Sequence, residues 1–281
     1  MYPIGDICYT AIMKPGTLHL IPSPIGSNTD VLAPYIRSIL ESVPYIIAEN
    51  EKTVRRFLAT QMSSELLAAK QFAILDEHTP FQDMPALLDP ILAGQDGAII
   101  SEAGLPCVAD PGSALVQLAH SHHIPVMPHP GPSAIFQTLM ASGLNGQRFM
   151  FEGYLPIQEQ ERLARLRFLE SLSSREQMSI LWIETPYRVK SLFASLCRVL
   201  REDTSLAIGQ SLMTEESFIY TATVCDWKKG AIELKKSPAV FAMQALPAAA
   251  GLRSNKSGCT AVGKPKKPSG KQGRPKKGPI F

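Results

Sequence analysis

The 281-residue sequence has few cysteines, and they lie far apart. There are five, none in a CxxC pair: Cys8, Cys107, Cys197, Cys225 and Cys259. Disulfide frameworks usually use an even number of cysteines, and structural zinc sites use closely spaced pairs. The sequence therefore predicts neither a disulfide nor a metal site. It favours reduced thiols, as in a cytoplasmic protein.

The sequence also has no long apolar run. No stretch of 18 uninterrupted apolar residues occurs, so no membrane span and no membrane partner are predicted. The first fifteen residues include Asp6 and have no basic segment ahead of an apolar one, which predicts no signal peptide. Hydrophobic residues make up 45% and charged residues 19% of the chain. This balance is typical of a globular protein that folds in water.

Several common functional motifs are missing. No GxGxxG follows an apolar strand-like run, and no Walker A loop, HExxH, EF-hand or GxSxG pattern is present in the folded part of the chain. These motifs mark the usual dinucleotide, phosphate, metal and serine-nucleophile sites. Their absence argues against those classes of enzyme.

Acidic residues are missing from the C-terminal segment. The net charge is +3, but residues 252–281 hold nine Lys and Arg and no Asp or Glu, which leaves 19 basic against 25 acidic residues, a charge of −6, in residues 1–251. The segment is rich in Pro, Gly and Lys, so it is predicted to be disordered. It is expected to bind nucleic-acid phosphates without sequence preference. The alternative is a tail that only adds solubility.

The remaining sequence alternates apolar runs with amphipathic stretches. The runs TLHLI, YIIAE, FAILDE, GAIIS and IPVMP are separated by helical patterns near 33–43, 51–61, 84–95 and 113–123. This alternation predicts an α/β fold with a mostly parallel sheet in an N-terminal domain, residues 17–129, after an extension at 1–16. The segment HPGPSA (129–134) cannot continue a strand or a helix and is the predicted domain junction.

A second α/β domain is predicted over residues 130–251, ahead of the basic tail. It begins with a helix capped by Ser133. The strand-like runs RFMFEGYL and MSILWIE and helices at 158–176 and 186–200 follow. The closely spaced runs SLAIGQSLM, FIYTATVCDW and PAVFAMQA favour antiparallel neighbours, and therefore a mixed sheet.

The segment GAIISEAGLPCVADPG (97–112) predicts a small-molecule site. An apolar run ends at Ser101 and Glu102, followed by Gly104. Ligands of open α/β sheets bind where the strands end, and glycine lets a ligand approach the backbone. Prolines and small residues at strand ends, such as Pro22, Pro24 and Gly26, predict rigid walls for a folded ligand.

Six segments, in order, resemble one family. TLHLIPSPIGSNTDVL (17–32), YIIAENEKTVRRFL (45–58), SEAGLPCVADPG (101–112), HPGPSAIFQTLMASGL (129–144), RFMFEGYLP (148–156) and WIETPYR (182–188) resemble motifs of the SAM-dependent tetrapyrrole methylase superfamily. Within it, the similarity is to the branch of small-subunit ribosomal RNA cytidine 2′-O-methyltransferases.

The resemblance implies two α/β domains with S-adenosylmethionine in the cleft between them. It also implies a homodimer and no metal. Carried over residue by residue, the expected cofactor-binding residues are Pro22, Pro24, Ser101, Glu102, Ala103, Gly104, Pro106, Ser133, Ala134, Ile183, Glu184, Gly209, Gln210, Ser211, Leu212, Pro238 and Ala239.

The base that would deprotonate a ribose hydroxyl has three candidates. Glu102 stands where the family has Asp, Glu49 follows an apolar run, and His78 has a side chain that titrates near neutrality. For His78, an ordinary loop histidine is an equal alternative. Arg55 and Arg188 are the candidates for binding substrate phosphates, or they form surface ion pairs.

The departures from the family pattern fall where the acceptor is expected to bind. They are Asn50, Glu51-Lys52 and Leu105, together with an extra polar residue in Ser27-Asn28-Thr29. The leading hypothesis is ribose 2′-O-methylation of small-subunit ribosomal RNA, aided by the basic tail. The alternatives are methylation of a tetrapyrrole-like small molecule and a non-catalytic SAM-binding factor associated with ribosomes.

Overall fold

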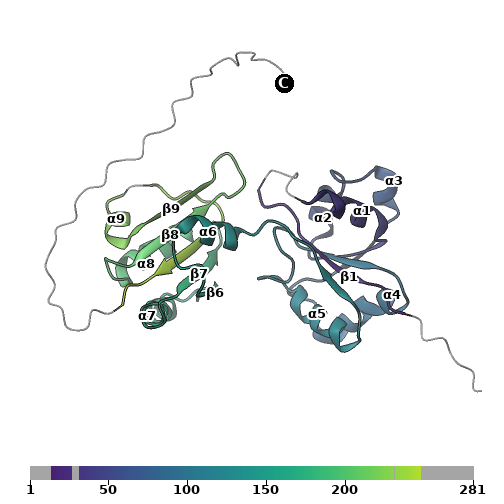
Figure 1. Cartoon of the computed structure of the whole chain (residues 1–281), viewed down its shortest axis with the longest axis horizontal. Helices are drawn as coiled ribbons and strands as arrows, with labels where there is room; N and C mark the ends of the chain where they lie inside the picture. The colour runs from purple at the N-terminus through teal and green to yellow at the C-terminus, as the bar shows by residue number, and fades with distance from the viewer. Residues whose placement is uncertain (1–13, 27–31, 231, 248–281) are drawn as a thin grey trace, which may run out of the picture.

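The computed structural model describes residues 14–26, 32–230 and 232–247. Within them the chain forms two lobes, each built on its own sheet (Figure 1). The predicted basic tail, most of the extension at 1–16 and the turn at 27–29 lie outside the described residues. In the part of the chain that is described, no helix is both long enough and apolar enough to cross a bilayer.

The N-terminal lobe has five parallel strands in the order β3-β2-β4-β1-β5. The strands are β1 (Leu18–Ile21), β2 (Tyr45–Ala48), β3 (Gln71–Ile74), β4 (Gly97–Ile100) and β5 (Val126–Pro128). They coincide with the five apolar runs, so the predicted parallel sheet is confirmed. Because the strands are parallel, their carboxyl ends share one edge, where the loops after β1, β2 and β4 gather.

Helices cover both faces of this sheet. One face is covered by α1 (Pro34–Ser42), α2 (Glu51–Leu58) and α3 (Ser64–Ala68), the other by η1 (Phe81–Leu88), α4 (Asp89–Leu92) and α5 (Gly112–Ser121). Successive strand residues point to opposite faces: Ile46 and Ile100 pack on the first, Ile47 and Ile99 on the second. Every residue of β2 and β4 is buried, which explains why these two strands read as continuous apolar runs.

One local prediction in this lobe was wrong, and one short helix was not predicted. The helix expected at 84–95 is a 3₁₀ helix, η1, followed by the single turn α4. Pro85 and Pro90 lack the N–H that a continuous α-helix needs, so the segment divides. The short helix α3 was not predicted. Ser63 caps it by accepting a hydrogen bond from the Leu66 N–H.

The C-terminal lobe has a mixed sheet in the order β6-β7-β10-β8-β9. The strands are β6 (Phe149–Tyr154), β7 (Ser179–Glu184), β8 (Ser205–Gln210), β9 (Phe218–Thr223) and β10 (Ala239–Gln244). Only the β6–β7 pair is parallel; the others are antiparallel. The predicted mixed sheet is confirmed.

Helices pack on both faces of this sheet as well. The helices α7 (Glu159–Glu176), α8 (Val189–Val199) and α9 (Val224–Lys228) pack on one face, and α6 (Ala134–Ser142) on the other. The run FIYTATVCDW was expected to be all strand. It turns into α9 because Thr223 caps a helix there, accepting a hydrogen bond from the Asp226 N–H.

Residues 129–133 connect the last strand of the first sheet to α6. Gly131 passes so close to Pro22 that an added Cβ would lie 2.2 Å from the proline Cγ. Ser133 caps α6 as expected, accepting from the Phe136 N–H at 3.4 Å. The connection therefore packs on the loop after β1. The domain limits at 129 and 251 stay a prediction.

Candidate functional site

A cavity of about 990 Å³ lies between loops of the two lobes. Its N-terminal wall is made by the ends of β1, β2 and β4. Its C-terminal wall is made by the start of α6, the ends of β7 and β8, and the start of β10. Sites for small molecules and cofactors have volumes of roughly 300–1,000 Å³ and often form between domains. The cavity is large enough for a nucleoside-sized ligand.

The loops after β1 and β4 are held together by their backbones. Ser23 and Gly104 exchange two hydrogen bonds, of 3.0 Å and 3.1 Å, and the Ser101 hydroxyl donates to the Gly104 carbonyl at 2.9 Å. Gly104 has φ +80°, a conformation that side chains disfavour. Ser101 is buried beneath the loop. It therefore positions the cavity wall rather than lining it.

The two lobes approach each other closely at Gly26. A Cβ added there would lie 2.6 Å from the Met213 carbonyl oxygen and 2.8 Å from that of Leu212, and Gly26 has φ +75°. Gly26 and Leu212 both line the cavity. Only glycine satisfies both the backbone angle and the close approach at this point.

Left-handed backbone gathers in the two loops that form the walls. Cys107 and Ala109 have φ of 66° and 57° after β4, and Ser211 and Met213 have φ of 53° and 60° after β8. Ser211 is held by a hydrogen bond from its hydroxyl to that of Ser237, 2.8 Å. Sparsely populated conformations of non-glycine residues cluster at ligand sites, where surrounding contacts hold them. This strain is a second indication of a functional site.

The cavity is acidic. Among the described residues, neither Lys nor Arg lines it. Six carboxylates do: Glu49, Glu102, Asp110, Glu184, Glu215 and Glu216. Burial, then the carboxylates of Asp110 and Glu102, raise the pKa of Glu49. A raised pKa makes the Glu49 carboxylate a stronger base than an ordinary glutamate once it is ionised.

Two other groups beside the cavity have raised pKa values. Burial, then the charges of Glu184 and Glu49, raise the pKa of the Tyr154 phenol. Burial, then Asp110, raise the pKa of the Cys107 thiol to about 12. Cys107 is therefore a thiol at neutral pH and cannot act as a nucleophile.

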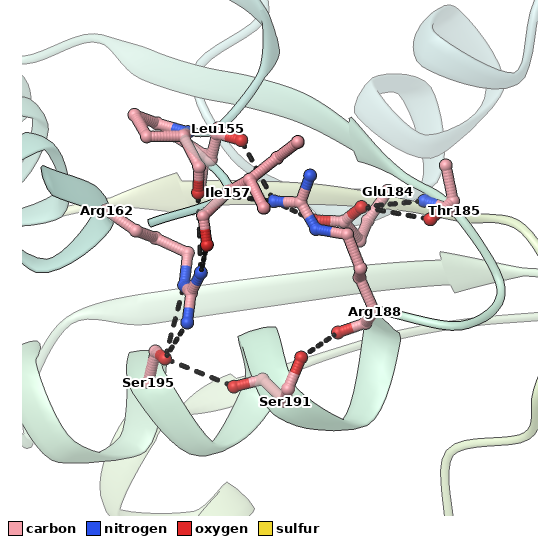
Figure 2. Close-up of polar contacts among 9 residues, drawn as sticks. Leu155, Ile157, Arg162, Glu184, Thr185, Arg188, Ser191 and Ser195 are labelled. Atoms are coloured by element: carbon pink, nitrogen blue, oxygen red, sulfur yellow. Dashed lines mark hydrogen bonds and ion pairs between the residues drawn. The ribbon is translucent and has the colours of Figure 1, made fainter. Parts of the chain in front are cut away.

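Glu184 is the only fully buried carboxylate among the described lining residues of the cavity (Figure 2). Its Oε1 accepts a hydrogen bond from the Thr185 N–H at 2.8 Å. Its Oε2 lies 3.1 Å from Arg188 Nη2, an ion pair whose geometry leaves this oxygen without a hydrogen bond from the described residues. A buried acceptor in a cavity wall with unused capacity fits a ligand that brings a donor.

Arg188 is engaged within its own lobe. Its guanidinium donates to the carbonyls of Leu155 and Pro156 at 2.9 Å and 3.3 Å, besides pairing with Glu184. Nearby, Arg162 donates to the Ile157 carbonyl at 2.7 Å (Figure 2). The two arginines hold the segment between β6 and α7 against the start of α8. The role proposed for Arg188 in substrate binding stays a prediction, and this geometry favours positioning of Glu184.

Most of the residues expected to bind the cofactor line the cavity. These are Glu102, Ala103, Gly104, Ser133, Ala134, Ile183, Glu184, Gly209, Ser211, Leu212, Pro238 and Ala239, joined by the candidate base Glu49. The other five are not among the lining residues: Pro22, Pro24, Ser101, Pro106 and Gln210. Gln210 is fully buried, and its side-chain amide bonds the backbone of Lys235 and Ser237.

Two of the other candidates lie away from the cavity lining. The His78 side chain is 84% exposed in the turn after β3, where Glu77 is its ion-pair neighbour at 3.7 Å. Arg55 pairs with Glu51 at 2.6 Å, and its guanidinium lies over the Phe72 ring. The structure therefore does not bring His78 or Arg55 to the other candidates. Their roles stay predictions.

Sequence reasoning missed several lining residues. The largest is Tyr154 at the end of β6; Ile25, Val108, Ala109, Asp110, Thr185, Pro186 and the stretch Thr214–Glu216 also line the cavity. Tyr154 lay inside a segment quoted for its family resemblance, and its place at a strand end was the available signal. Residues 214–216 carried no signal, because their loop reaches the site only through the contact of Leu212 and Met213 with Gly26.

No family model matches the chain. Solved structures with a similar fold include the methyltransferase CobJ (TM-score 0.55, 16% identity, 85% of this chain and 97% of that one). Another is uroporphyrin-III C-methyltransferase from Thermus thermophilus in complex with S-adenosylhomocysteine (TM-score 0.51, 16% identity, 82% and 97%). The fold is therefore that of the tetrapyrrole methylases, as predicted.

Curated relatives narrow the class. Ribosomal RNA small subunit methyltransferase I of Xylella fastidiosa is 34% identical over 66% of this chain and 64% of its own length. The protein of the same name from Mesorhizobium japonicum is 31% identical over 74% of this chain and 67% of its own. The chain spans about two thirds of the length of these relatives. It belongs to the ribosomal RNA small subunit methyltransferase I family.

Methyltransferases of this family use S-adenosylmethionine, so the predicted family, class of enzyme and cofactor are confirmed. The cavity fits that molecule on two grounds. Four of its six lining carboxylates have no ion-pair partner among the described residues, and they favour a ligand carrying a positive sulfonium and ammonium. The buried Oε2 of Glu184 receives no hydrogen bond from the described residues beside its ion pair with Arg188, and it can accept one from a nucleoside.

Replacing Gly26 tests whether the closely packed wall forms the donor site. Gly26→Ala places a methyl group against the Leu212 and Met213 carbonyls at positive φ, so the lobes must separate locally. We expect the dissociation constant for S-adenosylmethionine, measured by calorimetry, to rise about tenfold or more, the equivalent of roughly 1.4 kcal/mol.

Gly230→Ala is the matched control. Gly230 has φ +78°, close to that of Gly26, but an added Cβ meets no atom within 4 Å. This variant carries the same backbone penalty, roughly 1–2 kcal/mol of stability, away from the cavity. It should bind the donor normally. Equal donor affinity of both variants would show that the Gly26 wall is not part of the site.

Proposed function

We propose that this protein transfers the methyl group of S-adenosylmethionine to a ribose 2′-hydroxyl of small-subunit ribosomal RNA. Membership of the ribosomal RNA small subunit methyltransferase I family is the observation that carries the proposal. The cavity supplies a site for donor and acceptor side by side. The lining residues named above would hold the donor, with Glu184 and the loops at 102–104 and 209–212 against it.

The donor, when bound, supplies a methyl carbon already activated by a positive sulfonium. The chain therefore needs no electrophile of its own. Its task is to hold the 2′-oxygen in line with that carbon and to exclude water, an effect that contributes roughly 7–11 kcal/mol to such reactions. The rigid walls at Gly26 and Gly104 suit this task. As the new O–C bond forms, the C–S bond breaks and its electron pair remains on sulfur.

Glu49 is the residue we assign as general base. Its carboxylate lines the cavity, and its raised pKa increases its affinity for the proton that leaves the 2′-oxygen. Neighbouring carboxylates raise the pKa further because they disfavour a second negative charge. Glu102, the other candidate in the lining, is exposed and acts on Glu49 through its charge.

The acidity of the cavity argues against the small-molecule alternative. Porphyrin precursors carry several carboxylates around the ring. Of the six lining carboxylates, Glu184 and Glu216 are paired with Arg188 and Lys235, and the four that have no ion-pair partner among the described residues would repel such a ligand. A ribose hydroxyl is neutral and enters without this penalty. A non-catalytic SAM-binding factor remains the other alternative, and it predicts that Glu49 can be replaced without consequence for the biological role.

We further propose a cytoplasmic homodimer in which the segment 252–281 assists RNA binding. Nine positive charges and no negative ones favour contact with phosphates, while the rest of the chain is acidic. We place the domain limits at 17–129 and 130–251, with the cavity between them. The two sheets and the passage of residues 129–133 between β5 and α6 support these limits.

Methyl transfer to ribosomal subunits tests the function directly. Small subunits from a strain lacking this protein should accept label from S-adenosylmethionine at one ribose, and nuclease digestion with mass analysis should locate it. Free RNA and a porphyrin precursor serve as competing acceptors. Label on the porphyrin precursor alone would contradict the proposal.

Replacing Glu49 tests the mechanism. Glu49→Gln keeps the size and removes the base, so kcat should fall about 10²–10⁴-fold while donor affinity changes little. The wild-type rate should rise with pH through the raised pKa of Glu49, because only the ionised form accepts a proton. Because the pKa of Glu49 is raised in the folded state, the ionised carboxylate destabilises that state at a pH above this pKa. The neutral side chain of Glu49→Gln lacks this cost, so the variant should unfold at a slightly higher temperature at neutral pH.

Glu102→Gln is the companion variant. Removing this charge lowers the pKa of Glu49, because Glu102 is one of the groups that raise it. The rising limb of the pH–rate profile should therefore move to lower pH, with the plateau rate largely retained. If Glu102→Gln abolishes turnover and Glu49→Gln does not, Glu102 is the general base and Glu49 is not.

Deleting residues 252–281 tests the basic segment. The truncated protein should bind S-adenosylmethionine as before, because the cavity is made by residues 25–240. Its affinity for RNA should fall, and the slope of log K against log salt should become shallower as phosphate contacts are lost. Unchanged RNA affinity and slope would contradict a role for this segment.

A further inference from the structure

From the structure we infer that Tyr187 and Lys236 form a nucleotide-binding rim at the mouth of the cavity, with Tyr187 stacking on an RNA base and Lys236 contacting a phosphate. The inference rests on the proposed function and adds the residues that recognise the acceptor strand. Thr185 and Pro186 line the cavity, and Tyr187 follows them in the chain. Ser237 and Pro238 line it as well, and Lys236 precedes them.

The two side chains meet outside the cavity. Lys236 Nζ lies 4.1 Å from the centre of the Tyr187 ring, a cation–π contact. The Tyr187 residue is nevertheless 80% exposed, so it remains open to a partner. Exposed aromatic rings and arginine planes are the surfaces on which proteins stack unpaired RNA bases, and nearby cations bind the backbone.

Tyr187 sits on a turn that is fixed from both sides. The Arg188 N–H donates to the Thr185 carbonyl at 3.0 Å, which closes the turn, and the Thr185 N–H donates to Glu184. The Arg188 guanidinium points back into the lobe, toward Glu184 and the Leu155 carbonyl (Figure 2). The backbone is rigid while the Tyr187 ring is exposed. A ring held this way loses little entropy when it binds a base.

Lys236 is carried by an equally rigid segment. The buried Gln210 side chain accepts from the Lys235 N–H at 2.9 Å and donates to the carbonyls of Lys235 and Ser237 at 2.8 Å and 3.1 Å. Three hydrogen bonds therefore fix the backbone on both sides of Lys236. Its own side chain projects from this support to the Tyr187 ring.

The charges around the rim favour a phosphate at Lys236. Lys235 pairs with Glu216 at 2.7 Å and Lys190 with Glu233 at 3.6 Å, whereas Lys236 has no ion-pair partner in the described residues. The carboxylates within the cavity repel phosphates, so a strand that inserts one ribose must keep its phosphates outside. Within residues 235–238, which are all described, Lys236 is the positive charge that has no ion-pair partner and can contact such a phosphate.

The test compares variants of the full chain by their affinity for a fluorescent single-stranded RNA and by their KM for small subunits. Tyr187→Ala should weaken RNA binding about tenfold and raise KM similarly, and Tyr187→Phe should bind like the wild type, because stacking needs only the ring. Lys236→Gln should reduce the salt slope by about 0.7, one contact with a single strand. Donor affinity should stay constant.

Phe168→Ala is the matched control. Phe168 on α7 is also an exposed ring, 51% exposed, beneath a cationic side chain, with the Arg165 guanidinium carbon 5.0 Å from its centre. It lies outside the cavity lining, and its loss should leave RNA affinity unchanged.

The outcomes separate the rim from the proposed function. If wild-type protein binds RNA and methylates subunits but Tyr187→Ala and Lys236→Gln behave like the wild type, the rim is wrong and the function stands. If the variants lose RNA affinity but no protein labels the subunit, the rim stands and the function falls. If the wild type binds no RNA but labels the subunits, the rim is overturned and the function stands. If it neither binds RNA nor labels the subunits, both are overturned.

Discussion

The buried carboxylate of Glu184 connects the cavity to the framework that supports it. One oxygen binds the Thr185 N–H and the other faces Arg188, whose guanidinium also holds the segment between β6 and α7. A buried charge is tolerated only when it is paired, and here pairing one carboxylate fixes a cavity wall, a turn and a loop together. Tyr187 lies on the turn between the two partners of this ion pair.

Charge is divided between regions of the molecule. The cavity carries carboxylates, which suit a cationic methyl donor and raise the pKa of Glu49, the residue proposed as the base. Positive charge is placed at the rim, on Lys236, and in the basic segment at 252–281. An acidic body is therefore compatible with an RNA acceptor: the neutral ribose would enter the cavity while its phosphates stay where the positive charges are.

Hydrophobic patterning predicted the framework well, because buried parallel strands leave a direct trace in the sequence. The five runs of the first sheet and the close spacing of the last three strands were sufficient for both sheets. The helix predicted at 84–95 is divided because of its prolines, and the strand predicted through 224–228 becomes a helix because Thr223 caps it. Both are local effects that a periodicity argument overlooks.

For the site, the motifs indicated regions but not the direction of each side chain. Gly209 lines the cavity while Gln210, one residue on, is buried behind it, since successive strand residues face opposite ways. Ser101 lies beneath Gly104 for a different reason: its hydroxyl donates a hydrogen bond to the Gly104 carbonyl of the loop that follows it. Tyr154 also lines the cavity and could have been found from its place at the end of a strand, whereas Glu216 lies in a loop that carried no such signal.

The buried hydrophobic clusters have a consequence for folding. Among the described residues, two clusters belong wholly to the N-terminal lobe and two wholly to the C-terminal lobe, and none includes side chains from both. Each lobe thus has its own hydrophobic core. The two lobes meet at loop contacts such as that of Gly26 with Leu212. A ligand that touches both walls binds only when the lobes are both folded and correctly placed. By mass action such a ligand stabilises the two folded lobes together, although their hydrophobic clusters are separate.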